Sequence, residues 1–247
     1  MSYIYLEDVN LTFKIWREKK IKDILIPGSN RFNDFNNGSI SVIKSLNLDI
    51  KQGERVSIIG HNGAGKSTLL RLIAGIYKPT SGKREVEGRI SSMFELTTGF
   101  EMEQSGWDNI YLRGLMLGET PNSIKEKMAE IGEFSELGNF LNMPVKYYSS
   151  GMFVRLAFSV STAIQPDILL LDEVVGAGDA EFRGKANKRM KEMMKTAKVM
   201  VLVTHSMTDA INMSERCIWL ERGNIVMDGD PNFVTKEYMK GMIEEKI

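Results

Sequence analysis

The chain has 247 residues, 43% of them hydrophobic, which is enough to bury a sizeable core. Its 32 basic and 32 acidic residues cancel, so the composition does not indicate a nucleic-acid partner. A lone cysteine, Cys217, excludes an internal disulfide. No apolar run approaches the ~18 residues of a membrane span and the N-terminus lacks a signal-peptide pattern, so we expect a cytoplasmic protein whose membrane role would need a partner.

The N-terminal part of the chain is dominated by patterns typical of β-strands. Residues 3–13 are rich in β-forming side chains and predict one strand or two short ones, and residues 40–50 again alternate apolar and polar positions. Gln52 and Gly53 predict the turn of a hairpin that leads into the apolar run 56–59.

Between these strands, residues 14–39 differ in composition. Several basic residues surround Trp16, and apolar residues at helical spacing precede Pro27 and Gly28, which predicts a short amphipathic helix followed by a polar loop. A basic face with a tryptophan suits a membrane surface or the entrance of a partner protein. A solvated surface insertion explains the same residues, and the sequence leaves both interpretations open.

The phosphate-binding pattern G-x-x-x-x-G-K-[S/T] follows the apolar run 56–59 and opens into an apolar, helix-like segment. Its glycines allow a sharp turn that brings backbone N–H groups close to a triphosphate, and the helix start adds a positive dipole end. Lys66 can reach the β- and γ-phosphates, and the Ser67 hydroxyl can bind Mg²⁺. The expected nucleotide-binding residues here are Gly60, Asn62, Gly63, Ala64, Gly65, Lys66, Ser67 and Thr68.

The pattern becomes largely helical in the middle of the chain. Residues 89–96 predict a strand and 97–100 a loop. Apolar residues then recur at helical spacing in three stretches, 108–117, 121–132 and 153–164. Thr120 is the expected N-cap of the second stretch, with Pro121 at its first position. These stretches predict a helical subdomain over about residues 100–165, inserted between strands of the main sheet.

The third helical stretch begins with small residues, Ser149, Ser150 and Gly151. A helix start of this kind is a natural phosphate site, but a serine-capped helix explains the same residues. Farther along, the continuous apolar run 168–171 predicts a strand buried on both faces, which delivers Asp172 and Glu173 at its carboxyl end.

Open parallel sheets bind ligands at the carboxyl ends of their strands. Asp172 can hold Mg²⁺ there, directly or through water, while Glu173 can polarise the attacking water as a general base. Residues 199–203 predict a second buried strand, after which His205 can donate a hydrogen bond to a γ-phosphate. A last helix is expected from residue 232 to about residue 246.

Together these motifs resemble the nucleotide-binding subunits of ABC transporters, and the resemblance covers nearly the whole chain. The matches, in chain order, are Walker A at 60–67, the signature motif at 148–152, Walker B at 168–172, the catalytic glutamate at Glu173, the D-loop at 176–179 and the switch histidine at His205. The D-loop match adds Asp179 to the expected nucleotide contacts, and the catalytic roles would fall to Lys66, Glu173 and His205.

The resemblance implies an α/β fold, with a P-loop NTPase (RecA-like) core, an antiparallel β subdomain and the inserted helical subdomain in a single ABC ATPase domain over residues 1–247. ATP and Mg²⁺ are the implied cofactors. The implied assembly is a head-to-tail homodimer in which each ATP lies between one subunit's phosphate loop and the other subunit's signature helix. Ser149, Ser150 and Gly151 would then contact the γ-phosphate in trans.

The sequence departs from the general family pattern at several positions, and these departures indicate one subgroup of the family. The signature has Ser150 for a glycine and Met152 for a glutamine, and Glu95 stands nearest to the position of a Mg²⁺-contacting glutamine. These features, with the sequence after the signature and around the D-loop, resemble the exporters of O-antigen, capsule and teichoic acid. Segment 14–39 also resembles an insertion of this group. The expected metal contacts are therefore Ser67, Asp172 and Glu95.

This resemblance implies export of a lipid-linked polysaccharide through an integral membrane permease, with the chain held peripherally at the cytoplasmic face of the inner membrane and no nucleic-acid partner. Some members carry a C-terminal carbohydrate-binding domain, and we expect none here because the sequence stops at Ile247. Export of another solute (teichoic acid, lipid or drug) and a soluble, non-transport ABC ATPase are the alternatives. For adenine stacking, Phe13 is the first candidate and Trp16 the second.

Overall fold

A computed structural model describes residues 1–14, 38–173 and 180–244 of the chain. Most of the basic insertion, with Trp16, lies outside the described residues, as does the D-loop with Asp179. The expected end of the last helix near residue 246 also lies outside them.

The described elements alternate between strands and helices. The strands are β1 (Tyr3–Lys14), β2 (Ser39–Ile50), β3 (Arg55–Ile59), β4 (Ser81–Glu87), β5 (Ile90–Ser92), β6 (Ile168–Asp172), β7 (Val199–Val203), β8 (Arg216–Glu221) and β9 (Asn224–Gly229). The helices are α2 (Lys66–Ala74), α3 (Gly106–Met116), α4 (Pro121–Ser135), α5 (Ser150–Ala163), α6 (Ala180–Thr196), α7 (Met207–Met213) and α8 (Pro231–Glu244), with short 3-10 turns η2 (Gly138–Asn142) and η3 (Val145–Tyr147).

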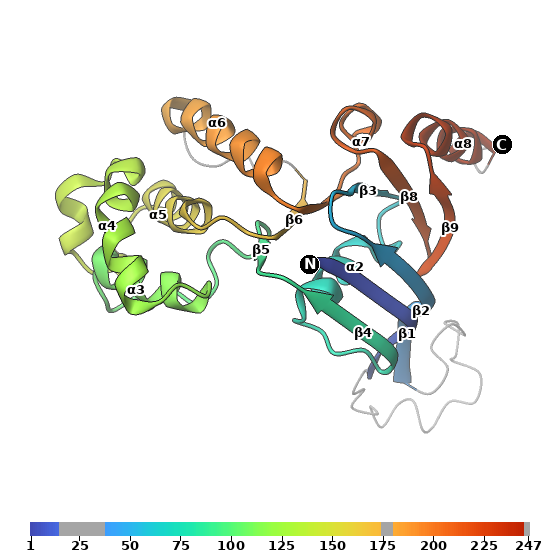
Figure 1. Ribbon diagram of the computed structural model, residues 1–247, viewed down its shortest axis with the longest axis horizontal. Helices are drawn as coiled ribbons and strands as arrows, with labels where there is room; N and C mark the ends of the chain where they lie inside the picture. The colour runs from blue at the N-terminus through green and yellow to red at the C-terminus, as the bar shows by residue number, and fades with distance from the viewer. Residues whose placement is uncertain (15–37, 174–179, 245–247) are drawn as a thin grey trace, which may run out of the picture.

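The described strands form two sheets (Figure 1). The smaller is antiparallel, in the order β2-β1-β4. The larger has the order β5-β6-β7-β3-β8-β9, in which the first five strands are parallel and β9 runs antiparallel to β8. An antiparallel sheet beside a mostly parallel one is the α/β arrangement expected from the sequence.

The prediction of a hairpin turn at Gln52 and Gly53 is wrong. β2 pairs with β1 in the small sheet, whereas β3 pairs in parallel with β7 and β8 in the large one. Gly53 does turn the chain, with a φ of 100°, but its N–H donates to the carbonyl of Lys198, 2.7 Å away. Four of the five β3 residues are buried. In the centre of the large sheet both faces of the strand are covered, so more of its apolar surface is buried there than in a hairpin with β2.

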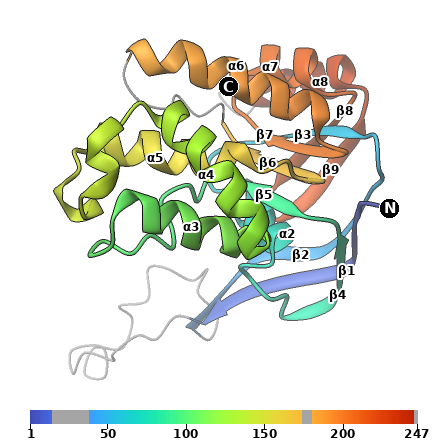
Figure 2. The ribbon, with the colours of Figure 1, turned by 60° about the vertical axis from the view of Figure 1, so that its left-hand side comes forward.

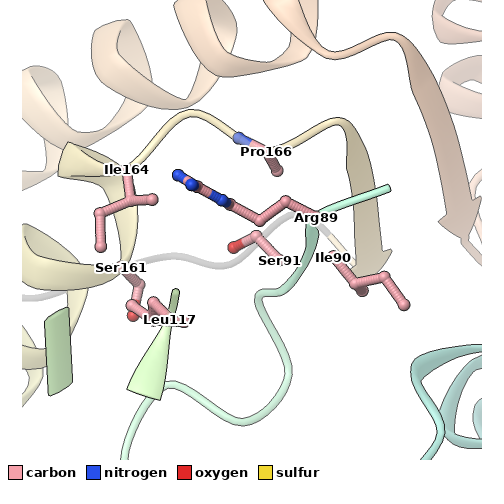
Figure 3. Close-up of a pocket in the computed structure, with 7 residues that line it drawn as sticks. All are labelled: Arg89, Ile90, Ser91, Leu117, Ser161, Ile164 and Pro166. Carbon is pink, nitrogen blue, oxygen red and sulfur yellow. The ribbon is translucent and has the colours of Figure 1, made fainter. Parts of the chain in front are cut away.

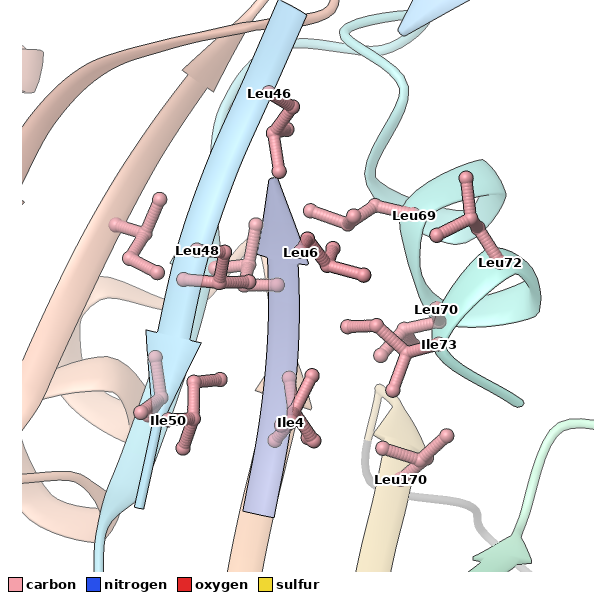
Figure 4. Close-up of a cluster of buried hydrophobic side chains, with 14 of the residues drawn as sticks. Ile4, Leu6, Leu46, Leu48, Ile50, Leu69, Leu70, Leu72, Ile73 and Leu170 are labelled. Atoms are coloured by element: carbon pink, nitrogen blue, oxygen red, sulfur yellow. The ribbon is translucent and has the colours of Figure 1, made fainter. Parts of the chain in front are cut away.

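The main core fills the space between the two sheets, with α2 lying in it (Figure 4). Ile4 and Leu6 of β1 face Leu69 and Ile73 of α2, and Leu170 of β6 closes the cluster from the large sheet. On the other side of the large sheet, α6, α7 and α8 form the outer layer (Figure 2). Cys217 is buried there, and burial raises the pKa of its thiol.

The helices α3, α4 and α5 form a separate lobe with its own core, which includes Ile110, Ile124 and Leu156. Thr120 caps α4 as expected, since its hydroxyl accepts a hydrogen bond from the N–H of Ser123. Figure 3 shows the junction with the sheet, where Arg89 extends toward the segment that follows α5.

One predicted strand is shorter than expected, and some strands were not predicted. The strand expected over 89–96 is only β5, because Met93 and Leu96 turn into the core between the sheet and the helical lobe. The strand β4 and the β8–β9 hairpin were not predicted. The residues of β4 and β9 are exposed or half-exposed and give a weak pattern, whereas β8 is largely buried. None of the helices in the described part of the chain is both long and apolar enough to span a bilayer.

Candidate nucleotide site

The phosphate loop connects β3 to α2, as the sequence predicts. Gly60 has a φ of 149°, and a Cβ on it would lie 2.1 Å from the backbone carbonyl oxygen of Leu220. Only glycine therefore allows β8 and the loop to come so close. Gly65 is also in the left-handed region, with a φ of 104°, and ends the loop directly before α2.

The N-terminus of α2 has the properties of an anion site. No side chain among the described residues caps it, so within the described part of the chain the first N–H groups of the helix have no side-chain acceptor. Negative charge is also favoured there by the helix dipole, and no acidic residue occupies the first turn. The loop and helix start therefore fit a polyphosphate.

Lys66 is buried at the start of α2. Its ammonium donates hydrogen bonds to the carbonyl oxygens of Gly60, at 2.7 Å, and His61, at 2.9 Å. Burial lowers the pKa of Lys66, while the negative charges of Asp172 and Glu173 act in the opposite direction. The phosphate loop and the two acids thus belong to one electrostatic site, although about a hundred residues separate them in the sequence.

Asp172 and Glu173 stand at the carboxyl end of β6. Asp172 is the last residue of the strand and is half-buried, opposite Val203 of β7. The N–H of Glu173 donates to the carbonyl of Val203 at 2.9 Å, and its φ of 61° is unusual for a residue with a side chain. Glu173 is exposed at this edge of the sheet.

His205 follows the neighbouring strand β7. Its Nε2 lies 3.8 Å from a carboxylate oxygen of Glu173. The preceding residue, Thr204, is buried and accepts a hydrogen bond from the N–H of Ser206, which stabilises the turn that presents His205. Sequence reasoning did not single out Thr204, because one hydroxyl in a loop has no distinctive pattern.

The expected metal contacts come from three elements. Ser67 is half-buried in the first turn of α2, and Asp172 ends β6. A hydroxyl and a carboxylate are oxygen donors of the type that Mg²⁺ prefers, so these two residues fit that ion. Glu95 lies in the turn after β5 and faces Arg71 of α2, with 3.9 Å between the charged atoms. Arg71 was not singled out, and the metal role of Glu95 stays a prediction.

Phe13 is near the phosphate loop and partly exposed. On the β1–β2 ladder it pairs with Ile40, two residues from Val42, whose carbonyl lies against Gly65. The Phe13 ring is 36% exposed and contacts Tyr77 edge to face, with ring centroids 5.2 Å apart. This position is compatible with stacking on a base, which stays a prediction.

The signature residues lie in the helical lobe, away from α2 (Figures 1 and 2). Ser149 is the N-cap of α5 and accepts a hydrogen bond from the N–H of Met152 at 3.2 Å. Ser149 and Ser150 are exposed and Gly151 is half-exposed. Within one chain these residues do not join the phosphate-loop site. The remaining expected contacts, Asn62, Gly63, Ala64 and Thr68, all lie in the loop or the first turn of α2.

The family model described as ABC transporter matches residues 43–176, which include the phosphate loop, the signature and both acids. The chain belongs to the ABC transporter family. This match confirms the expected family and, with it, the expected class of ATP-hydrolysing transporter subunit.

Relatives of this ABC protein are named for export systems. It is 43% identical over 203 residues to the O-antigen export system ATP-binding protein RfbB of Myxococcus xanthus, covering 82% of this chain and 46% of that protein. It is 38% identical over 222 residues to RfbB of Klebsiella pneumoniae, covering 90% of each. The teichoic acids export ATP-binding protein TagH of Bacillus cereus is 39% identical over 196 residues, covering 79% of this chain and 36% of that protein.

A solved structure supports the fold of this ABC protein. It superposes with a TM-score of 0.66 on the ATP-binding cassette MJ0796 in a dimeric, post-hydrolysis state bound to ADP and Pi. The two sequences are 24% identical, and the match covers 92% of this chain and 98% of that one.

Proposed function

We propose that this chain binds Mg²⁺ and ATP at the phosphate loop, hydrolyses the ATP, and thereby drives export of a lipid-linked polysaccharide across the cytoplasmic membrane. The observation that supports the site is the convergence of Lys66, Asp172 and Glu173 at one sheet edge, with His205 3.8 Å from Glu173. The relatives named for O-antigen export support the cargo.

Each residue of the site has a separate task in this proposal. Lys66 and the N–H groups at the start of α2 bind the β- and γ-phosphates. Ser67 and Asp172 hold Mg²⁺, which supplies neutralisation of the phosphate charge. Glu173 accepts the proton of the attacking water, and His205 donates a hydrogen bond to the γ-phosphate and keeps it in line with that water.

A second copy of the chain completes the site in this proposal. Ser149, Ser150 and Gly151 lie exposed at the start of α5, so their side chains and N–H groups are accessible to a γ-phosphate held by a partner subunit. Two copies would close around ATP and open after hydrolysis. The distance between their helical lobes would therefore change in each cycle of hydrolysis. That change would drive the membrane permease at the cytoplasmic face of the membrane.

The cargo is tested in the source cell, by replacing the chain with its Glu173→Gln form and locating the lipid-linked polysaccharide. We expect polymer to disappear from the surface and accumulate on the cytoplasmic side. Normal surface polysaccharide, with the variant stably produced and no second gene copy, would refute polysaccharide export but leave the ATPase assignment intact. Accumulation of teichoic acid instead would favour the alternative supported by the TagH relative.

A further inference from the structure

The helix α6 concentrates positive charge in a chain that is neutral overall. It contains six basic and two acidic residues, a net charge of +4, whereas the whole chain has a net charge of zero. The surface around this helix is therefore positively charged although the chain as a whole is neutral.

The basic residues of α6 divide between two sides of the helix. Lys185 and Arg189 face the helical lobe, where they form ion pairs with Glu136, at 2.9 Å, and Glu130, at 2.7 Å. Lys188, Lys191 and Lys195 are spaced i, i+3 and i+7, so they form a stripe, which we call the lysine face. All three are exposed, and none of them forms an ion pair with any described residue.

Two adjoining hollows, each of about 400 Å³, border the lysine face and share Lys191 and Lys195. One lies along α6 and the other between α6 and the end of α7, where Met194 and Met213 are half-buried. The acids at these hollows are Glu192 and Glu215, and Arg55 adds another positive charge. Positive charge therefore predominates around both hollows, and the one between α6 and α7 also has two methionines in its lining.

The lysine face is separate from the nucleotide site. Arg55 opens β3 and Glu215 comes directly before β8, so the second hollow lies at the amino edge of the parallel strands. The phosphate loop follows the opposite, carboxyl edge of β3. The guanidinium of Arg55 also donates to the carbonyl of Met194, which fixes the end of α6 against the sheet.

We propose that the lysine face is the docking surface of an acidic, amphipathic polypeptide segment of a partner protein. Carboxylates of the segment would pair with Lys188, Lys191 and Lys195, and an apolar side chain would enter the hollow between Met194 and Met213. Methionines adapt to irregular apolar groups, and unpaired lysines steer acidic partners. The surface is concave and partly apolar, which suits a polypeptide better than the flat, charged plane of a bilayer.

The test uses a fluorescent, amphipathic peptide of about 18 residues with leucine at every third or fourth position and a mixture of glutamate and alanine elsewhere, so that few glutamates are three or four residues apart. Binding to the purified full chain is followed by anisotropy. The variant is Lys191→Glu with Lys195→Glu, and the matched control is Lys125→Glu with Lys236→Glu, which changes the same charge at exposed lysines of α4 and α8. ATPase activity and melting temperature are expected to be the same in all three proteins.

We expect the native chain and the control to bind the peptide alike, and the variant to bind at least about tenfold more weakly because two attractive contacts become repulsive. Raising salt from about 50 mM to about 300 mM should weaken native binding severalfold. Equal binding by variant and native chain, or equal binding of a peptide with lysine in place of glutamate, would overturn the proposal. Binding to phosphatidylglycerol vesicles but not to the peptide would overturn it in favour of a membrane contact.

Discussion

The carboxylate of Glu173 and the imidazole of His205 lie 3.8 Å apart, on the ends of the adjacent strands β6 and β7. The separation exceeds a hydrogen bond, so both groups keep polar atoms available for a phosphate oxygen or a water molecule. Adjacent parallel strands place their carboxyl ends at one edge, which explains how residues 32 positions apart share a site.

Glu173→Gln should abolish turnover without abolishing ATP binding, because glutamine keeps the shape of the side chain but cannot accept a proton. We expect phosphate release to fall at least about 100-fold. ATP should then trap a dimer that elutes early in gel filtration. The matched control is Glu126→Gln, an exposed acid on α4. A variant that hydrolyses ATP at the normal rate would remove the general-base role.

His205→Ala should slow the chemical step more than it weakens binding, since His205 is exposed at the strand end and is not among the buried residues of the described core. We expect single-turnover hydrolysis to fall about 10- to 100-fold, with the ATP dissociation constant changed by less than about threefold. The opposite pattern, lost affinity with a normal single-turnover rate, would assign His205 to ground-state binding.

Lys66→Met should separate nucleotide binding from stability. The Lys66 ammonium is buried, and burial lowers its pKa, so its positive charge destabilises the folded state. Methionine removes the charge at similar length. Scanning calorimetry should find the apo melting temperature unchanged or higher, and the stabilisation by ATP lost. Retained stabilisation by ATP would mean that Lys66 does not bind phosphate.

Gly60→Ala should be far more damaging than Gly63→Ala, although both glycines have positive φ. A Cβ at Gly60 meets the carbonyl of Leu220 at 2.1 Å, and one at Gly63 meets no atom of the described residues within 4 Å. We expect losses of unfolding free energy of about 2–4 kcal/mol for Gly60→Ala and about 1–2 kcal/mol for Gly63→Ala, measured by urea titration. Similar losses would contradict the close approach of β8.

Glu119→Gln should destabilise the junction of the helical lobe in a pH-dependent way. The Glu119 carboxylate is 5% exposed and pairs with Arg89 and Lys127, each at 3.0 Å. A hydrogen bond from Ser123 is the largest of the influences that lower its pKa, followed by Lys127 and Arg89. Because the pKa of Glu119 is lower in the folded than in the unfolded chain, its ionised carboxylate adds to the free energy of unfolding. This contribution is complete above the unfolded-state pKa, about 4.3 for glutamate, and is lost as pH falls through the pKa of the folded state.

Urea unfolding of native chain and Glu119→Gln should therefore differ by about 1–3 kcal/mol near pH 7, with the difference shrinking toward about pH 3.5. Arg89→Lys serves as a comparison, because it keeps the charge but loses the second contact, from the guanidinium to the carbonyl of Gly118. A difference that is independent of pH would show that the pairing contributes nothing.

The sequence by itself determined the phosphate loop, Asp172 with Glu173, and His205. Each depends on contiguous residues: a glycine-rich turn before a helix, or polar residues directly after a buried apolar run. The N-cap Thr120 was predictable for the same reason, since capping is a local hydrogen bond. The family was also readable, because its motifs occur in a set order.

Only the tertiary structure decided how distant segments meet. The strand β3 left the expected hairpin because its partners, β7 and β8, come more than 140 residues later, and pairing across such a separation leaves no local pattern. The need for glycine at position 60 comes from Leu220, the charge on Glu95 faces Arg71, and Arg89 meets Glu119 across the lobe junction. These contacts depend on how helices and strands pack against one another. That packing is determined by the buried surfaces of the whole fold, so residues adjacent in the sequence do not predict it.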